Sequence, residues 1–194
     1  MAISNNSTGL RPGVCTSTTR PTAPYEGQMI YETDTDMVAI WNGTAWRYIS
    51  ATTPTNGTVL QVVAMTPYST ETSSSTSTYV DTGISATITP KSASSKILIL
   101  VSIAGVSKVN NTRCSLRLMR GGSQLIVLDQ KAGDTQDASN NNVGSCGATH
   151  LDSPATTSAT TYKVQFRSQG NVASVTVQTD GTCESTMILM EIAA

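Results

Sequence analysis

His150, the single histidine of the chain, lies two residues before Asp152 and three before Ser153, which are the residue types of a hydrolase triad. On an extended strand His150 and Asp152 point to the same face, whereas Ser153 follows the strand. A Ser-His-Asp triad normally assembles from distant segments, with an oxyanion hole beside the nucleophile. The spacing therefore favours a structural or surface histidine, and we expect no catalytic residues and no enzyme activity.

Asp34 and Asp36 flank a predicted turn and could together bind a hard cation. Calcium loops of this kind supply further oxygens at fixed steps and close with a bidentate glutamate, and no such set follows here. An aspartate-rich turn that hydrogen-bonds its own backbone explains the pair better. Because the sequence also has no phosphate loop and no dinucleotide fingerprint, we expect neither a metal nor a cofactor.

Four widely spaced cysteines, which form no CxxC pair, allow either free thiols or a disulfide framework: Cys15, Cys114, Cys146 and Cys183. Residues 1–6 lack the basic start and apolar core of a secretory signal, so we expect synthesis in a reducing cytosol and free thiols. The longest apolar stretch, Ile97 to Val101, is far too short for membrane insertion. Lysines and arginines are scattered, and the net charge is −1, so nucleic acid is not an expected partner.

The composition is typical of an all-β protein. Charged residues make up 13% and aromatic residues 5% of the chain, and serine, threonine, glycine and asparagine are abundant. No segment has the 3.6-residue period of an amphipathic helix. The pattern divides the chain into an extended arm, a small β-meander, a linker and a larger antiparallel sandwich of the jelly-roll kind, over residues 1–24, 25–50, 51–57 and 58–194.

The arm is rich in proline, glycine, serine and threonine, and it buries too little apolar surface to fold alone. It is either disordered or laid along another protein, and in the second case its anchors are Leu10, Val14 and Cys15. The meander follows as three short strands over residues 28–33, 37–41 and 46–49. Asn42-Gly43 predicts a tight type I′ hairpin with positive φ at both residues.

An isolated meander of this size is marginally stable in water, yet it carries many large side chains. We expect a partner surface to cover them, either from the rest of the chain or from other copies. The candidate contacts are Met29, Tyr31, Ile40, Trp41, Trp46 and Tyr48. Exposed tryptophan and tyrosine faces could instead bind sugar, but packing is the simpler explanation because the meander has no other core.

The larger unit shows about ten predicted strands. They lie at residues 59–66, 78–81, 85–89, 96–104, 112–120, 124–129, 147–152, 161–168, 173–179 and 185–192. The alternation predicts Cys114, Leu116 and Leu118 on a buried face, and likewise Tyr162, Val164 and Phe166. Two polar stretches, 68–77 and 132–142, are predicted loops, and the second is long enough to be mobile or functional.

The arm and meander resemble a module of tailed-bacteriophage structural proteins. The resemblance rests on the run from Gly13 to Asp36 and on the hairpin Trp41-Asn42-Gly43-Thr44-Ala45-Trp46. The larger unit is similar to a phage fibre or surface-protein domain through the runs 78–83, 94–99, 116–121 and 151–162. The resemblance implies a homotrimeric virion protein made in the bacterial cytoplasm, attached by its N-terminus to capsid, tail or baseplate proteins, with the sandwich displayed on the virion surface.

Three functions remain open from the sequence. The first is a short fibre, capsid decoration protein or tail appendage, in which the arm attaches and the meander trimerises. The second is a receptor-binding protein whose sandwich loops recognise a host-surface glycan, with the candidate contacts Asp134, Gln136, Asp137, Asn140 and Asn141. The third is a depolymerase of host polysaccharide, for which the isolated carboxylates give no visible acid pair.

Overall fold

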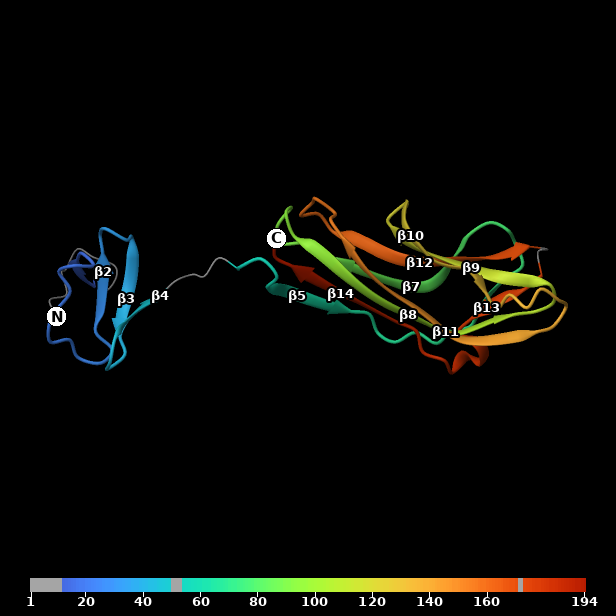
Figure 1. The fold of residues 1–194 in the computed structure, drawn as a ribbon, viewed down its shortest axis with the longest axis horizontal. Helices are drawn as coiled ribbons and strands as arrows, with labels where there is room; N and C mark the ends of the chain where they lie inside the picture. Colours follow the sequence, from blue (N-terminus) through green and yellow to red (C-terminus); the bar gives the residue numbers. More distant parts are fainter. Residues whose placement is uncertain (1–11, 50–53, 171–172) are drawn as a thin grey trace. The chain divides into compact units, whose positions relative to one another are not determined.

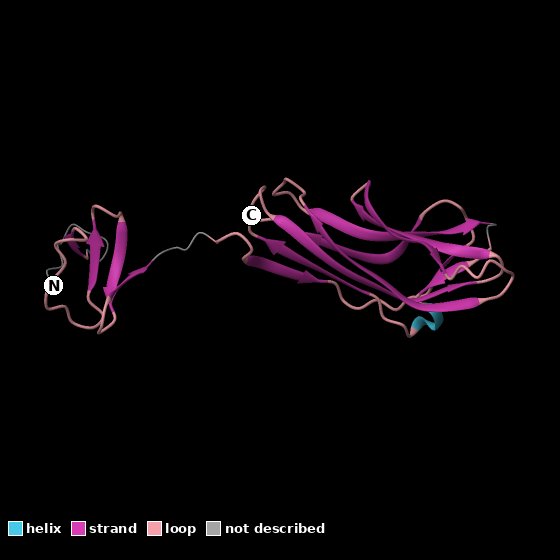
Figure 2. Ribbon diagram, in the orientation of Figure 1, coloured by secondary structure: helices cyan, strands magenta, loops and turns pink. Residues whose placement is uncertain are grey.

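The computed structural model describes residues 12–49, 54–170 and 173–194 and divides the chain into two compact units, Met1–Thr53 and Pro54–Ala194. Strands dominate both units, as Figures 1 and 2 show, and the one helical element of the described residues is the single 3-10 turn Thr179–Gly181. The all-β prediction is confirmed.

The N-terminal sheet contains four strands in the order β1-β2-β3-β4. Its strands are β1 (Gly13–Cys15), β2 (Met29–Glu32), β3 (Met37–Trp41) and β4 (Trp46–Ile49). The last three form the predicted antiparallel meander, and β1 joins β2 in parallel. The segment predicted as a separate arm therefore contributes a strand to the meander sheet, and the boundary at residue 24 does not divide two structural parts.

The turn after β3 differs from the predicted type I′ hairpin. Four residues, 42–45, connect Trp41 to its cross-strand partner Trp46. Gly43 has φ +90°, but Asn42 is not among the residues with positive φ. The Asn42 side chain instead accepts hydrogen bonds from the backbone N–H groups of Thr44 and Ala45, at 3.0 and 2.8 Å. The asparagine thus stabilises a longer loop through its side chain.

The C-terminal unit is built from two sheets. The β9 sheet has the order β10-β9-β12-β7, with β10 (Ser123–Ala132), β9 (Thr112–Arg120), β12 (Thr160–Gly170) and β7 (Val80–Ile88). The β8 sheet has the order β5-β14-β8-β13-β6, and β11 pairs with β8 in addition. Its strands are β5 (Val59–Ala64), β14 (Thr186–Ile192), β8 (Lys96–Lys108), β13 (Val175–Val177), β6 (Thr72–Ser74) and β11 (Asn141–Asp152).

One hydrophobic core fills the space between these sheets. Leu116, Tyr162 and Phe166 from the β9 sheet and Ile99 and Leu189 from the β8 sheet are fully buried within it. The predicted alternation on β9 and β12 is confirmed, since Cys114, Leu118 and Val164 also have no exposed surface. All strand pairs in this unit are antiparallel, and they nest: β5 with β14, β7 with β12, β8 with β11, and β9 with β10. The two sheets around one core are consistent with the predicted sandwich, and its jelly-roll arrangement stays a prediction.

Three strand predictions in this unit were wrong. The predicted strands 78–81 and 85–89 form the single strand β7, because Gly83, with φ +87°, makes a bulge against the Tyr68 ring instead of a turn. The predicted loop 68–77 contains β6. The predicted loop 132–142 is shortened, because β10 ends at Ala132 and β11 begins at Asn141.

The predicted linker 51–57 is only partly described. The backbone N–H of Gly57 donates to the carbonyl of Ala193 at 2.8 Å, and Ala193 in turn donates to Thr58. These bonds attach the last linker residues to the C-terminal unit, while residues 51–53 lie outside the described residues.

Candidate functional site

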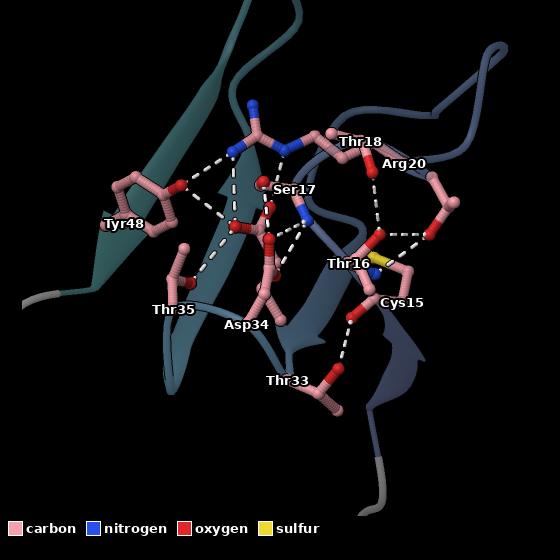
Figure 3. Close-up of polar contacts among 11 residues, drawn as sticks. Cys15, Thr16, Ser17, Thr18, Arg20, Thr33, Asp34, Thr35 and Tyr48 are labelled. Carbon is pink, nitrogen blue, oxygen red and sulfur yellow. Dashed lines mark hydrogen bonds and ion pairs between the residues drawn. The ribbon is translucent and has the colours of Figure 1, made fainter.

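Arg20 and Glu32 form an ion pair within the N-terminal unit, and Figure 3 labels Arg20 and Tyr48 among the residues around it. Glu32, at the end of β2, has no exposed surface, and the Nε of Arg20 lies 2.5 Å from its Oε1. The Tyr48 hydroxyl donates to Glu32 at 2.9 Å and accepts from Arg20 at 2.6 Å. Hydrogen bonding by Arg20 holds the pKa of the Glu32 carboxyl below its ordinary value. The charge on Glu32 is therefore fully compensated inside the unit.

A second set of contacts fixes the segment after β1. The backbone N–H and the hydroxyl of Ser17 donate to the Asp34 carboxylate at 2.8 and 2.6 Å, and the backbone N–H of Thr33 donates to the Cys15 carbonyl at 3.0 Å. The two hydrogen bonds from Ser17 lower the pKa of the Asp34 carboxyl, and the bond from the Ser17 hydroxyl is the main cause. Together with Arg20 they hold residues 15–20 against one face of the sheet.

The six predicted contact residues of the meander do not share one face. Cross-strand register places Tyr48 opposite Ala39, and Trp46 opposite Trp41, on the face that contains Glu32. The two tryptophan rings pack edge to face, with centroids 5.6 Å apart. They are half-buried within a single chain, so their predicted burial between chains stays a prediction.

The opposite face of the sheet is open and mostly apolar, with one charged side chain, Arg47, opposite Ile40. Met29 and Ile40 form one cross-strand pair, and Tyr31 and Val38 form the next. Val14 and Ile49 extend the second row onto β1 and β4 and are 54% and 53% exposed; Met29 is 45% exposed. We call Val14, Met29, Tyr31, Val38, Ile40 and Ile49 the open face. We call the face that contains Glu32 the covered face. The alternation of residues along β2 and β3 could have separated the two faces from the sequence alone.

The predicted attachment residues also fall on this sheet. Val14 belongs to the open face, whereas Cys15 stands opposite Glu32 on the covered face. Burial, and then the Glu32 charge, raise the pKa of the Cys15 thiol. Leu10 lies outside the described residues. Sequence reasoning missed Arg20 and Glu32, which lie 12 residues apart with no periodic relation.

The candidate receptor residues divide into two groups. Asp134 and Gln136 line a polar hollow of about 410 Å³ with Arg113, Lys131 and Gln169. The Arg113 guanidinium lies 3.0 Å from the Asp134 carboxylate. A backbone hydrogen bond from Gln136, followed by the Arg113 contact, lowers the pKa of Asp134. Arg113 Nε and Gln169 Oε1 are buried, and no described residue hydrogen-bonds to either atom.

The remaining three candidates support the loop itself. Asp137 accepts from the backbone N–H of Ser139 at 2.9 Å, and Asn140 accepts from Asn110 at 3.1 Å. The Asn141 amide donates to the Gly133 carbonyl at 3.3 Å. The hollow therefore has two of the five predicted residues in its wall.

The aspartates considered above as catalytic or cation-binding residues form hydrogen bonds to other side chains. Asp152 accepts hydrogen bonds from Tyr162 at 2.7 Å and from Arg120 at 2.8 Å, so its carboxylate joins β11 to β12 and β9. Asp34 is bound by Ser17, and Asp36 accepts from the Tyr31 hydroxyl. All four cysteines are free, as expected, and burial raises the pKa of the Cys114 thiol far above its usual range.

The described residues contain neither a grouped set of metal-ligating side chains nor a helix that could span a membrane. Within residues 12–49, 54–170 and 173–194, no three His, Cys, Asp or Glu side chains are grouped as a metal site would need. In the same part of the chain, no helix has the length and apolar character needed to cross a membrane.

No protein-family model matches the chain, and no curated protein matches it.

Proposed function

We propose that the chain is a non-enzymatic structural component of a tailed-phage virion, which assembles as a homotrimer through the open face of the N-terminal sheet. It would be made in the bacterial cytoplasm, attach to other virion proteins through its N-terminal residues, and display the sandwich on the particle as a short fibre or decoration protein. The resemblance of the arm and meander to phage proteins supports this assignment.

The open face is the observation on which the proposal depends. A four-stranded sheet that packs one face on its own chain normally keeps a polar outer face. Here the outer face has six apolar or aromatic side chains beside the single charged Arg47, and the unit is too small to bury the apolar ones itself. Three copies around one axis would cover all three open faces at once.

Met29→Lys tests the trimer. Placing a charge on the open face should raise the dissociation constant of the trimer at least about tenfold, because the ammonium group would lose water in the interface. Tyr25→Lys is the matched control, since Tyr25 is 69% exposed and lies outside the strands. Light scattering over a dilution series gives the masses. A wild-type chain that is monomeric at micromolar concentration would remove the proposal.

Attachment has a separate test. A chain without residues 1–11 keeps β1 and should still trimerise, but it should no longer join particles that lack the wild-type protein. Unchanged incorporation would show that attachment does not use these residues.

The polar hollow beside Asp134 favours a second function, receptor binding. Its wall combines the amides of Gln136 and Gln169 with Lys131 and the Arg113–Asp134 pair, which suits the hydroxyl groups of a glycan. Gln136→Ala should weaken adsorption to host cells about tenfold if the hollow binds sugar. Gln130→Ala, at an exposed position on β10 outside the hollow, is the control. A glycan array without signal would exclude this function.

A further inference from the structure

The outer face of the β9 sheet has one basic side chain in each of four successive rows. β9 and β12 lie side by side (Figure 1), and every second cross-strand pair of their register points away from the core. We call the four basic side chains the basic track. Successive rows are about 7 Å apart, so the basic track extends over about 20 Å. Its rows are Arg113 with Gln169, Arg167 with Ser115, Arg117 with Gln165, and Lys163 with Met119.

Ion pairs neutralise only the two ends of the basic track. At one end the Arg113 guanidinium lies 3.0 Å from the Asp134 carboxylate, and at the other end the Lys163 ammonium lies 3.0 Å from Asp81. The two arginines between them form no ion pair with any carboxylate in the described part of the chain. The middle of the basic track is therefore positive and open to an external anion.

Neutral groups hold the two central arginines in place. Arg117 donates from Nε and Nη2 to Gln165 at 3.0 and 2.7 Å and from Nη1 to Gln124 at 3.3 Å, which leaves two of its five N–H groups for a ligand. The guanidinium carbons of Arg117 and Arg167 lie 3.8 and 4.6 Å from the centroid of the Tyr79 ring. Because these contacts already order the side chains, an anion can bind them without a large loss of conformational entropy.

The polar hollow beside Asp134 continues the basic track at one end. Arg113 and Gln169 belong both to the wall of the hollow and to the first row of the basic track. A sugar chain with its hydroxyl groups in the hollow can therefore run along β9 and β12 and bring acidic groups to the central arginines. We infer that this face binds an acidic polysaccharide whose carboxylates contact Arg117 and Arg167. The inference rests on the receptor-binding function proposed above, and it names the class of glycan.

Single-stranded nucleic acid fits the basic track less well. Proteins that bind it combine a basic groove with aromatic side chains on which successive bases stack. In the outward rows of β10, β9, β12 and β7, no side chain is aromatic. The Tyr79 ring, which lies on this face, already packs against two guanidinium groups, and its hydroxyl lies 2.8 Å from the Ser115 hydroxyl. The face thus offers charge and hydrogen bonds but no stacking platform.

Calorimetric titration of the full-length chain at low salt tests the inference with three probes. A polygalacturonate oligosaccharide supplies carboxylates, a dextran oligosaccharide is its neutral match, and oligo-dT supplies phosphates. Polygalacturonate should bind most tightly, and Arg117→Gln/Arg167→Gln should weaken its binding about tenfold, because two charge-assisted contacts are lost. Lys91→Gln/Lys96→Gln removes the same charge from exposed positions outside the β9 sheet and should bind polygalacturonate as the wild type does.

A second variant keeps both arginines and their packing. Val127 stands opposite Arg117 and is 37% exposed, so Val127→Glu places a competing carboxylate beside the guanidinium and should also weaken polygalacturonate binding. Unchanged affinity in both variants, or tighter binding of oligo-dT, would overturn the inference. If Gln136→Ala impairs adsorption to host cells while the arginine variant adsorbs normally and binds polygalacturonate as before, the inference fails and receptor binding stands. Polygalacturonate binding that requires the arginines, with normal adsorption of Gln136→Ala, would support the inference and count against the hollow as the receptor site.

Discussion

The two units of the chain are stabilised in different ways. In the described part of the N-terminal unit the buried side chains are Ile30, Ala39 and the charged Glu32, whereas the sandwich encloses a large apolar core around Tyr162 and Phe166. A small sheet with so few buried apolar groups is marginal by itself. Hydrogen bonds and the Arg20–Glu32 ion pair therefore contribute much of the stability of the N-terminal unit, and the proposed association would add to them, while the sandwich can depend on burial.

Buried charge illustrates the same difference. In the N-terminal unit the buried Glu32, at the end of β2, is bound by Arg20 and Tyr48, and Ile30 and Ala39 are the other buried side chains among the described residues of that unit. In the sandwich, Asp152 and Glu191 lie near strand ends and are bound there by Arg120 and by Gln61 and the backbone of Lys91. Loss of one charge partner should accordingly affect the small unit more than the large one.

Phe166→Ala should have the largest effect and should act on the sandwich alone. Phe166 is fully buried, and removing its ring should cost about 3–5 kcal/mol of unfolding free energy. Urea unfolding followed by far-UV circular dichroism measures the loss. Tyrosine and backbone signals should shift while tryptophan fluorescence does not, because both tryptophans lie in the N-terminal unit. A coincident shift of both signals would show that the units unfold together.

Ile30→Ala is the matched change in the N-terminal unit. It should cost about 2–4 kcal/mol, which is enough to unfold a marginal unit at room temperature. Trp41 and Trp46 should then show the red-shifted emission of exposed indoles, while the circular dichroism of the sandwich remains. Native tryptophan emission in this variant would contradict the small core described for the unit.

Trp46→Ala should have an intermediate effect. It removes the edge-to-face partner of Trp41, and we expect a loss of about 1–2 kcal/mol in the N-terminal unit. The trimer should weaken before the sandwich melts, which light scattering and calorimetry on one sample can show. A lower melting temperature of the sandwich would contradict the independence of the units.

Mild acid should have the smallest effect and should again separate the units. Because the folded-state pKa of Glu32 is lowered, its contribution is present above the unfolded-state pKa of about 4.3 and is lost as the pH falls through the folded value. Tryptophan fluorescence should therefore report loosening of the N-terminal unit below about pH 4.3. Glu32→Gln should be less stable at neutral pH and should lose the part of this acid response that comes from Glu32, while Asp34, whose pKa is also lowered, keeps its own part.

Prediction from sequence succeeded where the signal is local. Alternation on β9 and β12 gave the buried set from Cys114 to Phe166, and the meander strands were found near their observed bounds. It failed at β7, where Gly83 makes a bulge, and at β1, which pairs with a strand 14 residues later. Glycine is compatible with either a turn or a bulge, and a three-residue strand has almost no period to detect.

By itself the sequence determined the strand class and the inward side chains of the long strands, because residue type and period two are local properties. Only the tertiary structure decided which face each sheet leaves uncovered. Residues 15–20 return over one face of the N-terminal sheet, and the β8 sheet places β5, β14, β8 and β11 side by side although they are far apart in the chain. Long-range pairing sets both arrangements, and no single segment encodes it.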